Sequence, residues 1–211
     1  MPLLAVVYTT PWDNYLVWKG VWSYPPDRVL GLIGYVPYEE YAFFILQSLL
    51  AGLWVFWLVR RLRTGSQRTG RTRWWGTAAY LALTLIGSVL LFTERSLYLG
   101  LILAWASPVL AFQWAFGGDL LSGVARVRAL AITTLTVYLW LADRLAIGLD
   151  IWQISPQYTT GLSILGLPLE EALFFLITNV MVVEGLLLFI HPVAWTRFHT
   201  LLAHLRPKHR I

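Results

Sequence analysis

Two pairs of adjacent glutamates stand at matching places in the chain, each at the start of a long apolar run. Glu39 and Glu40 form the first pair, Glu170 and Glu171 form the second, and each pair begins two residues after a proline. Carboxyl groups close together in an apolar environment hold their protons with different strength, so one can donate a proton and another can accept one. The pairs therefore indicate acid–base chemistry on an apolar substrate.

A simpler interpretation exists for each pair taken alone. A proline followed by acidic residues is a common helix start, because carboxylates stabilise the positive end of the helix dipole. Two copies, each preceded by an aspartate on the helix before it, fit this interpretation less well, and ionisable groups in membrane helices usually serve function. We therefore favour a functional role, with Asp13 and Asp143 as the aspartates.

The glutamates belong to a longer internal repeat. At a constant offset, the first copy matches the second through three residue pairs: Asp13 and Asp143, Trp22 and Trp152, and Gly31 and Gly161. One inserted residue before Pro168 then aligns the two glutamate pairs. The pattern predicts a duplicated two-helix unit. Because two further spans separate the copies, we expect parallel repeats whose acidic ends share one leaflet.

The composition predicts a membrane protein. Hydrophobic residue types make up 58% of the chain and charged ones only 13%. A chain of 211 residues cannot bury that much apolar surface in one soluble core. The sequence contains no cysteine, which excludes disulfides, thiolate metal sites and cysteine nucleophiles.

Apolar runs mark the helices that must position the carboxylates. A hydrocarbon core of about 30 Å is crossed by roughly 20 helical residues. Five such runs lie at residues 41–59, 74–92, 97–116, 129–149 and 172–190. A sixth, residues 2–18, is interrupted by Pro11 and Asp13 and is retained because of the repeat. The sequence thus predicts an all-α, polytopic integral membrane helix bundle with about six transmembrane helices.

Basic residues gather in every second connection and in the tail. They are Arg60, Arg61, Arg63, Arg68, Arg71, Arg73, Arg126, Arg128, Arg197, Arg206, Lys208 and Arg210. Because cytoplasmic loops are enriched in lysine and arginine, we expect these loops and the C-terminus to face the cytoplasm. The net charge of +5 then reflects membrane orientation, and no nucleic-acid partner is predicted.

The predicted organisation has four parts. A first repeat covers residues 1–60, and a basic cytoplasmic loop with a linker helix covers residues 61–96. A second repeat covers residues 97–190, and a basic cytoplasmic tail covers residues 191–211.

Helical phase separates the members of each pair. Neighbouring residues point about 100° apart on a helix, so only one glutamate of a pair faces the bundle interior. The stripes below Glu40 and Glu171 carry aromatic, polar and small residues, whereas the stripe below Glu39 carries leucines and resembles a lipid or packing surface. We expect Glu40 and Glu171 to be interior. Glu170 shares its stripe with Glu184, to which the pattern assigns no role.

Two other interpretations exist, a structural ion pair for Asp143 and a metal site built from histidines. Asp143 stands next to Arg144 and could form only a structural ion pair, although Asp13 has an asparagine at the equivalent place. The histidines, His191, His199, His204 and His209, do not share one helical face, so neither a metal site nor a cofactor is predicted.

No nucleotide-binding glycine motif, Walker loop or serine-nucleophile motif is present. What remains is proton chemistry in an apolar cavity whose aromatic faces can stabilise a cation. This combination indicates proton-initiated cyclisation of a polyene.

Several runs carry a resemblance to a known family. They are Tyr8-Thr-Thr-Pro-Trp-Asp-Asn-Tyr15, Gly20-Val-Trp-Ser-Tyr24, Gly34-Tyr-Val-Pro-Tyr-Glu-Glu-Tyr41, Pro168-Leu-Glu-Glu171 and Leu176-Ile-Thr-Asn179. With them, nearly the whole chain resembles the membrane-integral lycopene cyclases, in the fused form of the heterodimeric bacterial type. The cyclase domain of fungal bifunctional phytoene synthase/lycopene cyclases is similar as well. Family members usually carry a further helix before the one that holds Asp13, and here Met1 falls almost inside that second helix. We expect one of three explanations: the chain is shortened, its start is misassigned, or a neighbouring subunit fills the place.

The resemblance implies a lycopene beta-cyclase, an isomerase that converts the open ψ ends of lycopene to β rings, giving γ-carotene and then β-carotene. It implies no cofactor. The implied partners are lycopene or a related linear carotenoid within the bilayer, membrane lipid, and further copies of the chain in a homo-oligomer. The expected location is a prokaryotic cell membrane.

The expected catalytic residues are the two glutamate pairs with Asp13 and Asp143. A protonated Glu40 or Glu171 would start the reaction, and Asp13 or Asp143 would remove the ring proton. The expected substrate-binding residues are Phe43, Phe44, Phe174, Phe175, Trp12, Trp140, Thr178 and Asn179.

Two other classes fit parts of the pattern. A proton-coupled transporter of a hydrophobic substrate also uses repeats and membrane carboxylates. A membrane polyprenyl transferase would need clustered aspartates for Mg²⁺ and diphosphate, and Asp143 and Asp150 have no close acidic companions.

Overall fold

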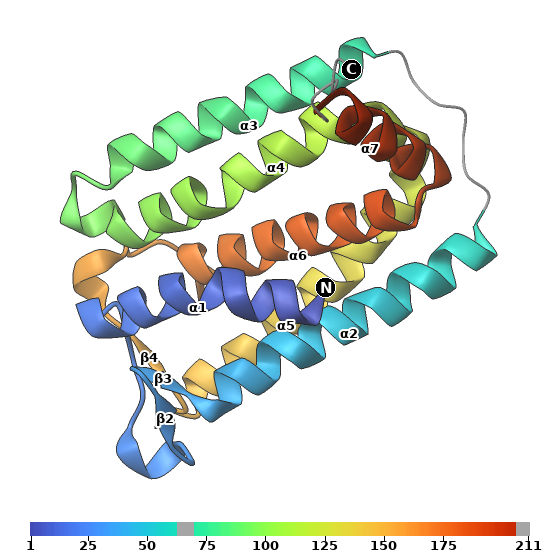
Figure 1. Ribbon diagram of the computed structural model, residues 1–211. Coiled ribbons are helices and arrows are strands. Elements are labelled where there is room, and N and C mark those ends of the chain that lie inside the picture. The colour runs from blue at the N-terminus through green and yellow to red at the C-terminus, as the bar shows by residue number, and fades with distance from the viewer. Residues whose placement is uncertain (63–69, 206–211) are drawn as a thin grey trace, which may run out of the picture.

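The computed structural model describes residues 1–62 and 70–205, and these form a bundle of long helices (Figure 1). The helices are α1 Pro2–Lys19, α2 Tyr38–Arg61, α3 Arg71–Leu90, α4 Leu97–Gly123, α5 Ala125–Gly148, α6 Leu169–Ile190 and α7 Pro192–Leu205. The basic residues Arg63, Arg68, Arg206, Lys208 and Arg210, and also His209, lie outside the described residues.

Four helices have the length and apolarity needed to cross a membrane: α2, α4 with the turn before it, α5 and α6. They coincide with the predicted runs at residues 41–59, 97–116, 129–149 and 172–190. The predicted runs at residues 2–18 and 74–92 also form helices, α1 and α3. They carry polar residues such as Asp13 in α1 and Arg73 in α3, and they are not among the four helices that meet both requirements.

Short strands fill the connections from α1 to α2 and from α5 to α6. The first holds β1 Trp22–Ser23, the 3₁₀ turn η1 Pro26–Arg28, β2 Leu32–Ile33 and β3 Val36–Pro37. The second holds β4 Gln153–Ile154, η3 Pro156–Tyr158, β5 Ser163–Ile164 and β6 Leu167–Pro168. In each connection the last two strands form a hairpin, and β1 pairs with β4 across the connections. Both connections therefore lie at one end of the bundle, here called the hairpin end (Figure 1).

The chain leaves α1 through a left-handed glycine. Gly20 has φ of 78°, and the amide of Val21 donates to the carbonyl of Leu16 at 2.9 Å, a hydrogen-bond pattern that closes a helix C-terminus. A residue with a side chain is strained at this φ, so glycine allows the abrupt turn into β1.

Close packing of α3 on α4 fixes the position of α4, which supplies residues to the site. A Cβ atom added at Gly87 would lie 2.7 Å from the Ala104 amide nitrogen, and one at Gly100 would lie 2.9 Å from that of Leu91. Glycines thus let the two backbones approach, as small residues do between membrane helices. The turn η2 Glu94–Ser96 joins the two helices.

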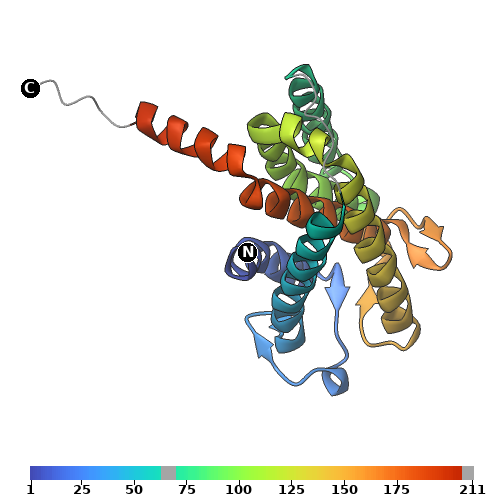
Figure 2. The ribbon, with the colours of Figure 1, turned by 90° about the vertical axis from the view of Figure 1, so that its right-hand side faces the viewer.

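Buried apolar residues form two groups along the bundle. The group towards the hairpin end is rich in aromatic residues and includes Trp12, Trp22, Tyr98, Phe174 and Phe175. The group at the opposite end is mainly aliphatic, with leucines and valines from α2, α4, α5 and α6. Beyond it α7 projects away from the bundle (Figure 2).

Candidate functional site

Four carboxyl groups from four helices converge near the hairpin end. Asp13 of α1, Glu40 of α2, Asp143 of α5 and Glu171 of α6 are all buried, with 0%, 8%, 3% and 2% of their surface exposed. Each aspartate interacts electrostatically with both glutamates. These four residues are called the carboxylate cluster below.

Prolines place the glutamates at helix starts. Pro37 and Pro168 are the N-cap residues of α2 and α6, so each glutamate pair falls in a first turn. The side chains there lie beside unpaired backbone amides and the positive end of the helix dipole, which stabilise acidic groups. The helix starts therefore bring Glu40 and Glu171 close enough to the aspartates of α1 and α5 to interact with them electrostatically.

Glu171 is held by two donors on one oxygen. The Tyr98 hydroxyl donates to Glu171 Oε1 at 2.6 Å, and Trp22 Nε1 donates to the same atom at 3.2 Å. Tyr98 belongs to α4 and is fully buried. The two donors fix the orientation of the carboxyl group and leave its second oxygen free for other contacts.

Glu40 has one hydrogen-bond donor from the first connection. The Tyr24 hydroxyl donates to Glu40 Oε1 at 3.3 Å. Burial raises the pKa of the Tyr24 hydroxyl well above its usual value, and the nearby Glu40 raises it further. Tyr24 therefore keeps its proton at neutral pH and remains a donor.

The other member of each pair holds a connection in place. Glu39 Oε1 accepts the Leu30 amide at 2.9 Å, and Glu170 Oε1 accepts the Thr160 amide at 2.6 Å. Glu39 is exposed, as the leucine stripe below it predicts, whereas Glu170 is fully buried. Both residues thus hydrogen-bond to equivalent parts of the two connections rather than facing the cluster.

The aspartates have no hydrogen-bond partner on either oxygen within the described part of the chain. The alternative of an ion pair between Asp143 and Arg144 is likewise not found among residues 1–62 and 70–205. A buried carboxyl group with no donor is unusual in a purely structural setting. Its oxygens are available for proton exchange.

Aromatic rings enclose the cluster. Trp12 stacks on Trp105 with ring centroids 4.6 Å apart and on Phe174 at 5.4 Å, and it meets Trp22 edge to face at 5.8 Å. Phe43 of α2 meets Phe175 of α6 at 6.3 Å. These faces exclude water and offer electron-rich surfaces to a cation.

Two neighbouring cavities lie at the cluster, and the smaller of them is lined by two of its carboxyl groups. A small one of about 10 Å³, here the acid cavity, is lined by Glu40, Glu171, Trp22 and Trp152 together with Phe43, Phe174 and Phe175. A larger one of about 240 Å³, the middle cavity, shares Phe43 and Phe174 with it. The middle cavity is lined mainly by apolar side chains, so it suits an apolar ligand.

The expected substrate-binding residues divide between the cavities and their surroundings. Phe43, Phe44, Phe174 and Thr178 line the middle cavity, and Phe175 lines the acid cavity.

Three others support the walls of these cavities in the described structure. Trp12 stacks behind Phe174, and Trp140 donates to the Ala172 carbonyl at 2.9 Å. Asn179 links α2 to α5, since it accepts from Gln47 Nε2 at 2.5 Å and donates to Thr136 Oγ1 at 3.1 Å.

The sequence did not single out Tyr98, Tyr24 or Trp105. Tyr24 and Trp22 occur in a motif shared with the related family, which was a usable signal. Tyr98 and Trp105 lie in α4, outside the two matched helix pairs α1–α2 and α5–α6, and only the packing of α4 on α6 reveals their place. Within residues 1–62 and 70–205, no group of three or more histidine, aspartate or glutamate side chains is arranged to hold a metal ion.

Glu184, unexplained by the sequence pattern, forms a separate buried ion pair. Arg128 Nη1 lies 3.2 Å from Glu184 Oε1, and Trp114 Nε1 donates to Glu184 Oε2 at 3.0 Å. The Arg128 guanidinium also lies over the Trp114 ring, 5.2 Å from its centroid. This group joins α4, α5 and α6 at the end away from the hairpins, so its role is structural.

Replacing Glu184 with glutamine is expected to destabilise the protein by about 3 kcal/mol, because the partly buried Arg128 loses its counter-charge. Thermal unfolding in detergent would measure the change. Glu94→Gln is the matched control, since Glu94 lies in an exposed turn and only accepts a 3.4 Å hydrogen bond from Gln157. Equal midpoints for the two variants would contradict the structural role of Glu184.

The fold and the site together define an integral membrane protein with a buried carboxylate cluster beside an apolar cavity. No family model and no solved structure matches the chain. Curated relatives of similar sequence do match the chain. The chain is 48% identical over 186 residues to a lycopene beta-cyclase of Halobacterium salinarum, an alignment that covers 88% of this chain and 78% of that protein.

Fungal proteins match over a similar part of the chain. A bifunctional lycopene cyclase/phytoene synthase of Aspergillus niger is 43% identical over 192 residues, covering 87% of this chain and 33% of the fungal protein. One from Podospora anserina is 36% identical over 201 residues, covering 89% of this chain and 34% of the fungal protein. The chain belongs to the lycopene cyclase family, and the resemblance predicted from the glutamate pairs is confirmed.

Proposed function

We propose that this chain is a lycopene beta-cyclase that closes the ψ ends of lycopene into β rings, giving γ-carotene and then β-carotene, without a cofactor. The observation that carries the proposal is the carboxylate cluster, buried among aromatic rings, with Glu40 and Glu171 lining the acid cavity beside the apolar middle cavity. The family relationship supports the same reaction.

The reaction needs one proton in and one proton out. Glu40 or Glu171 donates a proton to the terminal double bond, which becomes a tertiary cation. The neighbouring double bond attacks this cation, closing a six-membered ring and moving the charge into it. Asp13 or Asp143 then removes a ring proton, so the product is an isomer of the substrate.

The aromatic walls serve two needs of this reaction. Water would trap the cation as an alcohol, and the rings of Trp12, Phe174 and Phe175 keep water out. Their faces also stabilise positive charge as the ring forms. In this scheme Glu39 and Glu170 act indirectly, by holding the connections that close the hairpin end.

We propose further that α1 and α3 complete a set of six spans, and that α1–α2 and α5–α6 are the two copies of a parallel repeat. Both connections have the same order of strand, 3₁₀ turn and hairpin. Gly20 and Asp150, which follow the ends of α1 and α5, both have positive φ. The equivalent hydrogen bonds of Glu39 and Glu170 also support the duplication.

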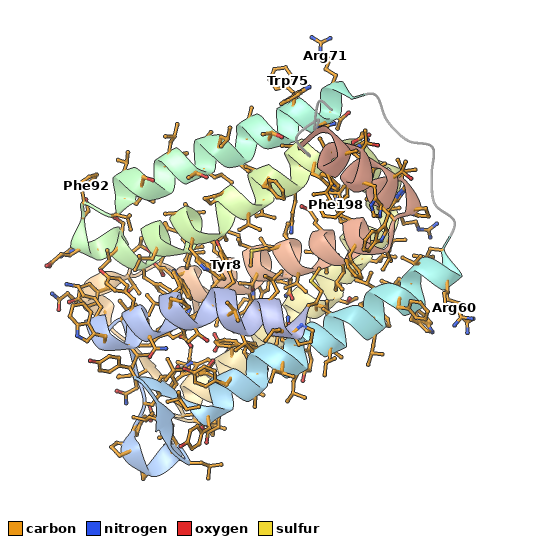
Figure 3. The ribbon with its side chains drawn as sticks, viewed as in Figure 1. Tyr8, Arg60, Arg71, Trp75, Phe92 and Phe198 are labelled. Atoms are coloured by element: carbon orange, nitrogen blue, oxygen red, sulfur yellow. The ribbon has the colours of Figure 1, made fainter. Side chains whose placement is uncertain are left out.

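In the proposed orientation the basic end of the bundle faces the cytoplasm of a prokaryotic cell. Arg60 and Arg71 both lie at the end opposite the hairpins (Figure 3). Arg126 begins α5 at that end, and Arg197 of α7 is paired with Asp119 at 2.8 Å. The four-part organisation, with repeats at residues 1–60 and 97–190, follows the same scheme. Assembly into a homo-oligomer belongs to the proposal as well.

Expression of the chain in a bacterium that accumulates lycopene tests the function. We expect β-carotene to replace lycopene in the pigment extract, as measured by chromatography with absorption spectra. Unchanged lycopene in cells that contain the folded protein would contradict the proposal. A proton-coupled transporter would redistribute lycopene without changing it, and a polyprenyl transferase would consume a diphosphate.

A further inference from the structure

The cavities continue beyond the middle cavity along α6. A third cavity of about 300 Å³, here the far cavity, shares Met1, Gln113 and Gly185 with the middle cavity. Its remaining walls come from α4, the end of α6, and α7, which supplies Ala194, Trp195 and Phe198. The acid, middle and far cavities therefore lie in a row along α6, each sharing wall residues with the next, and this row is called the trough below.

The trough is as long as the membrane is thick. Glu171 lines its first cavity and Phe189 lines its last, and both belong to α6. At about 1.5 Å per residue these positions lie about 27 Å apart along the helix. A hydrocarbon core is about 30 Å thick. A long linear polyene fits such a trough lengthwise, with one end at the carboxylates and the other beside α7.

Both glutamates serve the same end of this trough. Glu40 and Glu171 come from different halves of the chain, yet they line one small cavity. A conjugated polyene is stiff and cannot fold back on itself, so its two ends cannot both reach that cavity in one binding event. Each event therefore closes one ring, and the half-closed molecule must leave and return reversed before the second ring forms.

From this geometry we infer that the far cavity is the binding site for the ring made first, and that its width decides whether the product has one ring or two. The inference rests on the proposed cyclase function. When lycopene binds, the far cavity holds a slender open end; when γ-carotene binds for its second reaction, the same cavity must hold a bulky closed ring. Side chains there thus discriminate between the two substrates without touching the carboxylates.

Ala194 of α7 offers the test, because it is buried and lines the far cavity. Ala194→Leu narrows this cavity, and misfit in an apolar pocket lowers the rate by about tenfold or more. We expect the first ring to form at close to the normal rate and the second to be slowed, so that γ-carotene accumulates and its ratio to β-carotene rises by about tenfold.

A second variant narrows the trough closer to the carboxylates and should slow the closure of both rings. A Cβ atom at Gly185 would lie 3.1 Å from Gln113 Nε2 and 3.4 Å from the Met1 Cε, where the middle and far cavities join. Gly185→Leu is expected to slow consumption of lycopene itself by about tenfold. Gly52→Leu is the control, since a Cβ atom at Gly52 meets nothing within 4 Å. It should leave both rates unchanged.

Purified variants would be assayed in lipid vesicles with lycopene or γ-carotene as substrate, after thermal unfolding has shown that each is folded. Isotope dilution tests whether γ-carotene leaves the protein between the two ring closures. Labelled lycopene given together with unlabelled γ-carotene should yield β-carotene with a diluted label. An unchanged γ-carotene to β-carotene ratio in folded Ala194→Leu, or undiluted label in β-carotene, would overturn the inference. Absence of any ring product from the wild-type protein would instead overturn the proposed function.

Discussion

Glutamine in place of either Glu40 or Glu171 is expected to stop ring formation, lowering its rate by about 10²–10⁴-fold, the usual contribution of a positioned acid or base. Glutamine keeps the shape of the side chain but cannot deliver a proton. Because both glutamates line the acid cavity, neither variant should stop at γ-carotene. Pigment extracts from lycopene-accumulating cells, normalised to the amount of folded protein, would measure the loss.

The matched controls are Glu39→Gln and Glu170→Gln. An amide oxygen still accepts a hydrogen bond, so the contacts with the amides of Leu30 and Thr160 survive in these variants. We expect most of the β-carotene yield to remain. Normal yield from Glu40→Gln and Glu171→Gln would contradict the assignment, and equal losses in all four variants would show that the pairs do not divide their roles.

The sequence predicts this division because helical phase is a local property. The 3.6-residue period places Glu40 above a polar and aromatic stripe and Glu39 above a leucine stripe, and the structure buries the first and exposes the second. For the second pair the local rule is incomplete. Glu170 is buried as well, because its connection folds over it and supplies the Thr160 amide.

Contacts between distant segments could not be predicted in the same way. The hydroxyl of Tyr98 reaches Glu171 across 73 sequence positions, and Arg128 reaches Glu184 across 56. Nothing in the spacing of these residues indicates that their helices are neighbours; only the packing of α4 and α5 on α6 does. Asn179 is a further example, since its spacing did not indicate hydrogen bonds to Gln47 and Thr136, and its role in binding stays a prediction.

The membrane spans show where composition is sufficient and where it is not. α6 is recognised by hydropathy alone although it carries Glu170, Glu171 and Glu184, because the rest of the helix is strongly apolar. α1 carries Pro11 and Asp13, and its helix was predicted only from the repeat. In α1 these polar residues weaken the hydropathy signal, whereas α2, α5 and α6 each carry a cluster carboxyl group and are still recognised.

Asparagine in place of Asp13 or Asp143 is expected to lower the rate of ring formation by about 100-fold, because the ring proton loses its acceptor. Both aspartates are buried, and neither oxygen of either residue accepts a hydrogen bond within the described residues. Their replacement therefore breaks no contact that holds the fold. We expect thermal unfolding to change little, and a loss of activity would then report on proton transfer.

The residual products would identify the step that each aspartate serves. A cation that loses its base survives longer, so it should release a proton from another carbon or capture water. We expect extracts of Asp13→Asn or Asp143→Asn cells to contain rings with a displaced double bond or a hydroxyl group, detected by chromatography and mass spectrometry. Asp27→Asn is the control, because its side chain is 79% exposed and pairs only with Arg28 at 3.7 Å in the described structure. Normal amounts of β-carotene from both cluster variants would show that the proton leaves to another acceptor.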